Sequence, residues 1–573
     1  MIETAGEGSS AGDRAFGRNL RSKGLAGFLC RPALLDAGLL LLFAGLAVCF
    51  QISRTHLVPD FMDLTGDAAN IAGFAAALDH PDFFEGDGLL ADPRNFRFYA
   101  TIHLPLIRLL AKLTGSYGNA FASTLGVHLF LQLTGFFILG RVLFRSRFWA
   151  FVLALVTLPY VSVGLVTHWG LSADAIPRMS FSSLFGFLLA AALYWRSSPL
   201  AWPGIMLAAG LLMYVHPVSA PTAAFAVWLG FWAMKPASWS RSAQGGYMLF
   251  LGLVFLLAAL PFLAVYLSSH EHGRVDHYDQ IMSILEYRFV GGFMNVPLGL
   301  AKIFAHLIQS MVLPMGVLGA CVLFRWGNPD RKILITLGLW LLGIVLAAGA
   351  LPWAVSALNQ AMRALPVQID LIRGLRLAVP LLLIIFVWGL AEMEAGERRL
   401  LHGGLLLAGC WFAFHARMPV QAPLIDAPLS AAEVVILGKQ GTPERADVRD
   451  AVQAVRKLTP PRSRIFTLDR GTALRVRYAA LRPVVLCSKD GGALAYTNLA
   501  ELTRWYPAIK RFRALRGLPW SRHKANGLLH MAREFRADFL LSEGGAEVAA
   551  LFEGAALVWT NGSFFLIRVQ AEG

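Results

Sequence analysis

Long apolar runs alternate with short polar connections over the first 416 residues of the chain. A helix needs roughly 20 apolar residues to cross the hydrocarbon core of a membrane, and on that criterion we predict about eleven transmembrane helices. They lie near residues 34–52, 119–142, 148–166, 180–195, 200–216, 221–235, 246–267, 300–324, 332–350, 373–392 and 399–415. This pattern predicts a polytopic α-helical membrane protein.

The composition agrees with this prediction. Of the 573 residues, 56% are hydrophobic and 15% are charged, whereas soluble domains carry about 25% charged residues. The five cysteines are scattered without a C-x-x-C pair and indicate neither a disulfide framework nor a zinc site. The formal net charge of +15 is typical of topology signals and of contact with anionic headgroups, so we predict membrane lipids as partners and no nucleic acid.

Lysine and arginine gather in every second connection, and this bias predicts the orientation of the chain. The basic arm of residues 1–33 is predicted to be cytoplasmic, and no small-residue cleavage site follows the first apolar run, so we expect no cleaved signal peptide. The transmembrane bundle then covers residues 34–416. Its external segments are predicted at residues 53–118, 168–178, 216–221, 268–297 and 351–370.

Residues 417–573 have the composition of a soluble domain, and an odd number of helices places it outside the membrane. Helical periodicity covers residues 446–458, 499–515 and 527–536, and strand-like runs lie at 463–468, 483–487 and 538–542. Two further runs, 556–560 and 563–569, flank Asn561-Gly562, which is a strong hairpin signal. We therefore predict a small C-terminal α/β extracytoplasmic domain.

The first external segment is rich in carboxylates although the chain as a whole is basic. Asp60 and Asp63 follow the first apolar run directly, and a carboxylate at a partly apolar surface can have its pKa raised until it serves as a general base. A solvated acidic loop without chemistry is the alternative. Apolar positions at helical spacing predict an amphipathic helix along the membrane surface over residues 67–79, with Asp67 as a candidate cap, and a second over residues 98–113.

Single polar residues at the outer ends of predicted helices are the other candidates. Arg373 and Arg376 begin the tenth helix at its outer end, where the positive-inside bias disfavours arginine. Residues three apart share a helix face, so both guanidiniums could reach one anionic group while Asp370 orients Arg373; snorkelling to headgroups is the alternative. Arg178 and His216 also lie at outer helix ends, and each taken alone favours a structural role.

Histidines form two further groups. The segment His270–His277 holds three histidines with Glu271 and Asp276, which could gather a divalent cation; a solvated loop is the commoner explanation, and we assign no metal site. His128 and Gln132 lie four residues apart within the second predicted helix. We expect them to make hydrogen bonds between helices.

This layout resembles the GT-C superfamily of polyprenyl-phosphate-sugar-dependent glycosyltransferases. The resemblance covers nearly the whole chain and is strongest at Asp60-Phe61-Met62-Asp63, at Pro177-Arg178, at His216-Pro217 and over residues 371–376. The run RVRYAALRPVVLCSKDGGALAYTNLAELTRWYPAIKRF, residues 475–512, also resembles the end domain of bacterial membrane proteins of this type. The resemblance implies a GT-C-like bundle in the bacterial inner (plasma) membrane.

The resemblance also implies a reaction. A sugar would pass, with inversion, from a polyprenyl-phosphate-linked donor to a cell-envelope glycan or lipid acceptor at the outer face. Asp60 or Asp63 would take the proton of the acceptor hydroxyl, and the remaining substrate-binding residues would be Asp67, Arg178, His216, Arg373 and Arg376, of which the last two hold the lipid phosphate. Several members carry an adjacent Asp-Glu pair, whereas the acids here are spaced, which leaves open which aspartate acts.

Two functions of other classes remain as alternatives. A transporter or flippase of a lipid-linked envelope precursor would favour paired halves with broken helices and midplane charges, and the sequence shows neither a repeat nor an acid deep in a predicted helix. In a non-catalytic envelope assembly protein, the outer domain would bind partners and the aspartates would only be surface residues.

Overall fold

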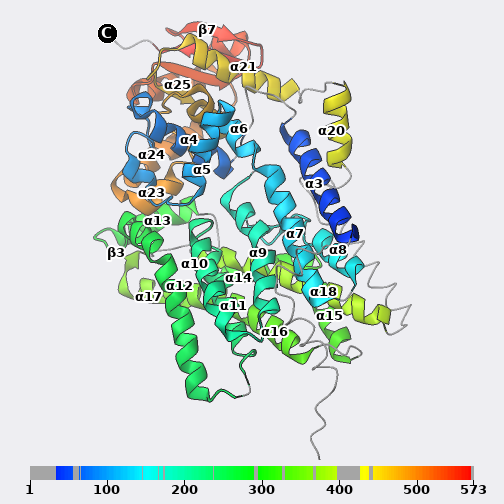
Figure 1. The fold of residues 1–573 in the computed structure, drawn as a ribbon. Coiled ribbons are helices and arrows are strands. Elements are labelled where there is room, and N and C mark those ends of the chain that lie inside the picture. The colour runs from blue at the N-terminus through cyan, green and yellow to red at the C-terminus, as the bar shows by residue number, and fades with distance from the viewer. Residues whose placement is uncertain are drawn as a thin grey trace, which may run out of the picture.

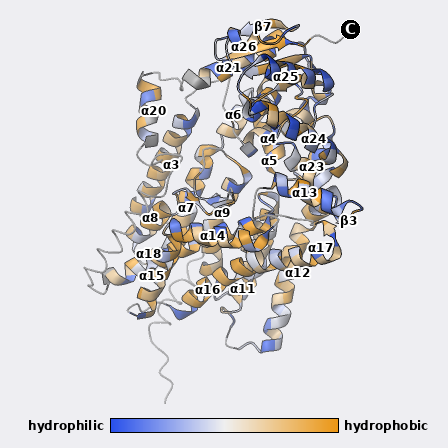
Figure 2. Ribbon diagram, turned by 180° about the vertical axis from the view of Figure 1, so that it is seen from behind, coloured by the Kyte–Doolittle hydropathy of each residue, from blue (hydrophilic) through white to orange (hydrophobic). Residues whose placement is uncertain are grey.

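The computed structural model describes residues 34–55, 64, 66–144, 146–165, 167–171, 175–236, 238–289, 295–325, 330–365, 370–395, 426–437 and 443–569. A helical bundle carries a small α/β domain at one end, with the first external segment between them (Figure 1). The bundle is built mostly of apolar residues, and the domain is more hydrophilic (Figure 2). The described residues therefore form an apolar bundle and a more hydrophilic end domain.

The helices of the bundle pack backbone to backbone at glycines. A Cβ added to Gly186 would lie 2.7 Å from the carbonyl carbon of Gly135, and one added to Gly389 would lie 3.0 Å from the Cα of Gly319. Such close approach is typical of membrane helices, in which small residues make the contacts. The helices are α3 (Leu34–Thr55), α7 (Leu125–Leu143), α8 (Arg147–Val156), α9 (Pro177–Tyr194), α10 (Trp202–Leu211), α11 (Ala220–Phe231), α12 (Arg241–Ser269), α14 (Val296–Gln309), α15 (Val312–Arg325), α16 (Arg331–Val345), α17 (Leu351–Met362), α18 (Ala378–Ala395) and α20 (Asp426–Leu437).

Five helical stretches of the described chain are long and apolar enough to cross a membrane, and a sixth results if α14 and α15, which meet at 68°, form one broken span. The predicted helices near residues 148–166, 200–216 and 221–235 are shorter apolar helices in the structure. The eleventh, near residues 399–415, lies outside the described residues. The count of about eleven is not confirmed. The five stretches are Leu35–Thr55, Tyr117–Leu143, Arg241–Ser269, Arg331–Met362 and Leu371–Met393.

The third predicted helix differs from the structure over its second half. Helix α8 ends at Val156, and the chain turns into a short antiparallel hairpin of β1 (Val161–Ser162) and β2 (His168–Trp169). Pro159 cannot continue a helix because it lacks an N–H and clashes with the preceding turn. Gly164 has φ +80°, a left-handed conformation that favours glycine. The apolar run is therefore long enough for a span, but the helix ends before Pro159, and Gly164 lies in the turn of the hairpin that follows.

The segment predicted to be the first external one, residues 53–118, contains α4 (Gly66–Asp79), η1 (Pro81–Phe84), η2 (Pro93–Phe96) and α5 (His103–Thr114), and α6 (Tyr117–Ala122) follows it at the start of the apolar stretch Tyr117–Leu143. Helix α4 begins one residue before the predicted range of 67–79 and ends where predicted, but it does not lie on a surface. Its residues from Ala68 to Ala77 are buried except Asn70, because the small alanines let α5, α6 and the C-terminal domain pack closely around it. Helix α5 does expose an apolar face, with Leu109 and Leu113 57% and 75% accessible.

The C-terminal domain is built around a four-stranded sheet in the order β5-β6-β8-β7, with β5 and β6 parallel and the other pairs antiparallel. The hairpin across Asn561-Gly562 and most helices follow the sequence pattern, but residues 483–487 make only an isolated bridge at Val484. The elements are α21 (Pro443–Leu458), β5 (Ile465–Thr467), α22 (Arg470–Arg475), the π-helix η7 (Val476–Ala480), α23 (Gly491–Thr497), α24 (Leu499–Arg516), α25 (Arg522–Glu534), β6 (Phe539–Glu543), α26 (Ala546–Ala549), β7 (Ala556–Thr560) and β8 (Phe564–Arg568).

Candidate functional site

Five cationic side chains from distant parts of the sequence gather where the bundle, the first external segment and the C-terminal domain meet. We call them the basic cluster: Arg178 at the start of α9, Arg288 at the end of α13 (Tyr278–Arg288), Arg373 and Arg376 in η6 (Leu371–Leu377), and Lys489 just before α23. They interact electrostatically with one another or with the carboxylate of Asp67. Positive charge is therefore concentrated around one acid.

Asp67 lies in the first turn of α4 and is paired with Lys489. The Lys489 Nζ lies 2.5 Å from the Asp67 Oδ1, and the two side chains are 20% and 51% exposed. Lys489, helped by Arg178 and Arg373, holds the pKa of the Asp67 carboxyl far below its usual range, although the surrounding protein opposes ionisation. Asp67 is therefore ionised, accessible to solvent and a weak base while Lys489 remains beside it.

Arg376 is the buried member of the basic cluster. Its side chain is 1% exposed, its Nη2 donates a 2.7 Å hydrogen bond to the hydroxyl of Ser219, and its Nε has no hydrogen-bond partner among the described residues. Arg178 and Arg373 lie near enough to repel it. No described carboxylate makes an ion pair with Arg376. A buried guanidinium without a counter-ion is costly, so this arrangement favours an anionic ligand.

Local packing explains why Arg376 is held there. Segment η6 crosses the start of α11 so closely that a Cβ on Gly374 would lie 2.4 Å from the Thr222 Oγ1. Glycine is therefore required at this crossing, and it brings the next turn of η6 against Ser219, the residue before α11.

Arg373 is held by an acid of its own. Its Nη1 lies 3.4 Å from the Asp370 Oδ2, as the sequence spacing predicted, and the Tyr496 hydroxyl donates a 3.3 Å hydrogen bond to the same oxygen. Tyr496 belongs to α23, so the C-terminal domain contacts the same acid that holds this guanidinium.

Two histidines complete the surroundings as neutral groups. Burial, together with the nearby arginines, holds the pKa of His216 and of His168 well below the usual range. The Nδ1 of His216 accepts a 3.2 Å hydrogen bond from the backbone N–H of Ser219, which places its proton on Nε2. His168 comes from β2, where its ring packs 4.4 Å from that of Tyr160.

The structure thus brings together Asp67, Arg178, His216, Arg373 and Arg376, all of which the sequence suggested as substrate-binding residues. Asp60 and Asp63, the suggested bases, lie outside the described residues. The sequence did not indicate Lys489, Arg288 or His168. His168 lay at the edge of one segment predicted to be external and Arg288 within another, residues 268–297, but no local signal set either of them or Lys489 apart.

Other carboxylates of the first external segment have structural partners. Asp79 binds Arg108 at 2.6 Å and accepts a 2.9 Å hydrogen bond from the Tyr117 hydroxyl. Asp92 pairs with Arg94 at 2.7 Å. Some carboxylates of this segment therefore make structural ion pairs and need no role in chemistry.

The histidine-rich segment does not gather around a metal position. No group of three or more His, Cys, Asp or Glu in the described chain is arranged to hold a metal ion. Instead, the Glu271 carboxylate accepts a 2.9 Å hydrogen bond from the Leu499 N–H, and the His270 Nδ1 lies 2.5 Å from the Tyr266 carbonyl. This segment fastens the C-terminal domain to the end of α12.

His128 and Gln132 connect helices, as predicted. The Gln132 Nε2 donates to the Thr157 carbonyl at 3.0 Å, and the His128 Nε2 lies 2.6 Å from the Ser180 hydroxyl. Ser180 also contacts the His103 Nε2 at 2.9 Å. These contacts tie α7 to the end of α8, to α9 and to α5.

No protein-family model matches the chain, and no curated protein matches it. Among solved structures, the chain is similar to ArnT from Cupriavidus metallidurans, whose crystal structure is bound to undecaprenyl phosphate. The two are 13% identical, the match covers 93% of this chain and 98% of ArnT, and the TM-score is 0.41. At this TM-score the likeness does not establish a shared fold, and the side chains of the basic cluster carry the functional inference.

Proposed function

We propose that the protein is a membrane glycosyltransferase of the GT-C type. It moves a sugar from a polyprenyl-phosphate donor to a glycan or lipid acceptor of the cell envelope, at the outer face of the membrane. The observation that carries the proposal is Arg376, which is buried beside two other arginines and makes no ion pair with a described carboxylate. The sequence resemblance supplies the reaction, and the basic cluster supplies the anion site that this reaction needs.

A lipid phosphate suits this position. The cluster joins arginines of the apolar bundle to Lys489 of the polar domain, and in the proposed complex the polyprenyl chain stays in lipid while its phosphate reaches the cations. Arginine binds phosphate through a planar fork of N–H donors. The phosphate would supply the negative charge that Arg376 lacks among the described residues.

The proposed chemical step is the one that the sequence resemblance implies, and the basic cluster supplies its cations. An aspartate of the first external segment takes the proton of the acceptor hydroxyl, and the resulting oxygen attacks the anomeric carbon with inversion. The bond from that carbon to the phosphate oxygen breaks, and the polyprenyl phosphate leaves with the electron pair. Preorganised cations stabilise this charge where water is excluded, and each such donor contributes several kcal/mol, on the order of 3. Asp60 and Asp63 are the proposed bases.

The experiment that tests the proposal measures binding first. Purified protein in nanodiscs of zwitterionic lipid is titrated with a polyprenyl phosphate, and wild type is compared with Arg376→Met. We expect the variant to bind about 10- to 100-fold more weakly, because hydrogen bonds to a charged group contribute about 1.5–3 kcal/mol. Arg331→Met is the matched control, since Arg331 is exposed at the start of α16. Equal affinity of all three proteins would overturn the proposal.

Transfer is measured in the same nanodiscs. A radiolabelled polyprenyl-phosphate sugar is supplied with envelope lipid and glycan as acceptors, and Asp60→Asn and Asp63→Asn are compared with wild type. We expect one of the two variants to lose transfer while it still binds polyprenyl phosphate. A protein that binds the lipid and moves it across the bilayer without transferring sugar would instead be the flippase.

A further inference from the structure

The C-terminal domain reaches directly into the basic cluster. Lys489 and Tyr496 both belong to this domain, and α23 passes so close to Arg288 that a Cβ on Gly492 would lie 2.4 Å from the Arg288 Nη2. Two of the contacts that hold the acids of the site, Lys489 to Asp67 and Tyr496 to Asp370, therefore come from the domain and not from the bundle.

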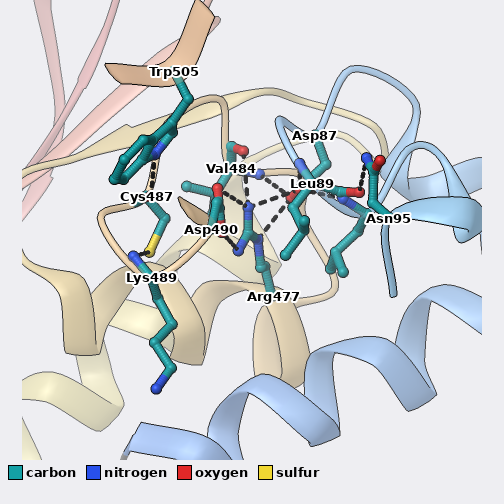
Figure 3. Close-up of polar contacts among 10 residues, drawn as sticks. Asp87, Leu89, Asn95, Arg477, Val484, Cys487, Lys489, Asp490 and Trp505 are labelled. Carbon is teal, nitrogen blue, oxygen red and sulfur yellow. Dashed lines mark hydrogen bonds and ion pairs between the residues drawn. The ribbon is translucent and has the colours of Figure 1, made fainter. Parts of the chain in front are cut away.

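The backbone on both sides of Lys489 is fixed by a buried network (Figure 3). Arg477 donates to Asp490 at 2.6 Å and to Asp87 at 2.7 Å, and these three side chains are at most 1% exposed. On the other side, the Trp505 Nε1 donates to the Cys487 carbonyl at 3.0 Å. The Lys489 side chain extends away from this network (Figure 3), and its Nζ reaches Asp67.

The two kinds of ion pair differ in a way that matters for function. The Arg477 pairs are sealed from solvent, so separating them would leave buried charges without partners. The pair of Lys489 with Asp67 is partly accessible to solvent, and ion pairs that water can reach are weak, so its partners separate more easily. The backbone holds Lys489 in place while its ammonium group stays free to change partner.

We propose that Lys489 exchanges partners: it binds Asp67 in the ligand-free protein and the phosphate of the polyprenyl phosphate when that ligand is bound, which releases the Asp67 carboxylate. This inference rests on the proposed function, because it takes the phosphate site from it. Asp67 then acts as the resting counter-ion of the site. Its release beside a newly bound anion makes it a stronger proton acceptor than it is next to Lys489.

The exchange predicts opposite effects for the two partners. Nanodiscs of zwitterionic lipid are titrated with a polyprenyl phosphate and, separately, with inorganic phosphate, which lacks the lipid chain. Asp67→Asn removes the competitor for Lys489 and should tighten binding about 3- to 5-fold. Lys489→Met should weaken it about 10-fold, and Lys489→Arg should restore it. In the double variant, the gain from Asp67→Asn should shrink to less than about 2-fold, because the released ammonium group is gone.

A merely structural pair gives a different result. If Asp67 and Lys489 only hold α23 against α4, both single substitutions weaken binding, and that outcome overturns the exchange. The sign pattern must appear with both ligands, because the exchange concerns the phosphate and not the hydrocarbon chain. Arg376→Met separates the two proposals. Loss of binding in Arg376→Met with wild-type affinity in Lys489→Met overturns the exchange alone, whereas wild-type affinity in Arg376→Met overturns the phosphate site itself.

Discussion

Arg477 joins the C-terminal domain to the first external segment, and replacing it tests how strongly the two are held. Arg477→Met keeps an unbranched apolar stem but removes the guanidinium, which leaves Asp87 and Asp490 without their cation. Removing one partner of a buried pair costs about 3–5 kcal/mol. Asp87 retains three backbone donors, the N–H groups of Leu89, Leu90 and Val484, so the loss falls mainly on Asp490. We therefore expect a value near the lower limit, about 3 kcal/mol.

The measurement is denaturant unfolding of the purified full chain in detergent, followed by tryptophan fluorescence. Arg462→Met is the matched control, because Arg462 pairs with Glu85 at 3.8 Å and joins the same two segments, but with the side chains 56% and 69% exposed. An exposed pair of this kind contributes about 0–1 kcal/mol. If Arg477→Met lowers the free energy of unfolding no more than Arg462→Met does, the buried network does not hold the domain in place.

A second substitution checks the cause. Burial raises the pKa of the Asp490 carboxyl even with Arg477 beside it, so an uncompensated Asp490 is the main penalty in the variant. Asp490→Asn in the Arg477→Met background should recover about 1–2 kcal/mol, whereas the same change in wild type should destabilise the protein. Destabilisation in both backgrounds would mean that lost packing, and not buried charge, explains the first result.

Two other predictions concern the C-terminal domain and the hairpin of β1 and β2. Gly491→Ala would place a Cβ within 2.5–2.8 Å of three ring atoms of Trp505, and we expect a loss of about 1–3 kcal/mol in the same unfolding assay, whereas Gly517→Ala, with nothing nearer than 3.5 Å, should be nearly neutral. The pKa of His168 is lowered to about 2, so below pH 6.5 the unfolded chain takes up a proton that the folded chain does not. Between pH 7 and pH 5, the free energy of unfolding should therefore fall by about 2 kcal/mol less in His168→Gln than in wild type. If the two proteins lose the same amount, the buried neutral histidine is not the cause of the loss.

Elements with a repeated local pattern could be predicted from the sequence. The predicted helices over residues 446–458 and 499–515 match α21 and α24 to within a few residues, and Asn561-Gly562 marks the observed turn. The third predicted helix extends too far because its apolar run continues past Pro159, whereas the helix ends at Val156. Burial of α4 could not be read from spacing, since its alanines satisfy either a surface helix or a tightly enclosed one.

The residues of the candidate site also fall into those that a local sequence pattern indicates and those that it does not. Arg373 and Arg376 could be found because arginine at an outer helix end departs from the usual charge bias. Lys489 could not be found in this way, because it is one of many basic residues in its domain. Its contact with Asp67 joins residues 422 positions apart in the sequence. The contact depends on how the C-terminal domain packs against the first external segment.

The buried Arg477 network and the basic cluster meet at two neighbouring residues, Lys489 and Asp490. Stability and ligand binding are therefore linked. Asp490 belongs to the sealed network and its neighbour Lys489 to the accessible pair, so a change that loosens the first displaces the second. A substitution in the network that weakens phosphate binding must therefore do so in proportion to its effect on unfolding. Lys489→Met lies outside the network and should weaken binding with little loss of stability, since its pair is exposed. That difference separates a residue that binds the ligand from residues that only position it.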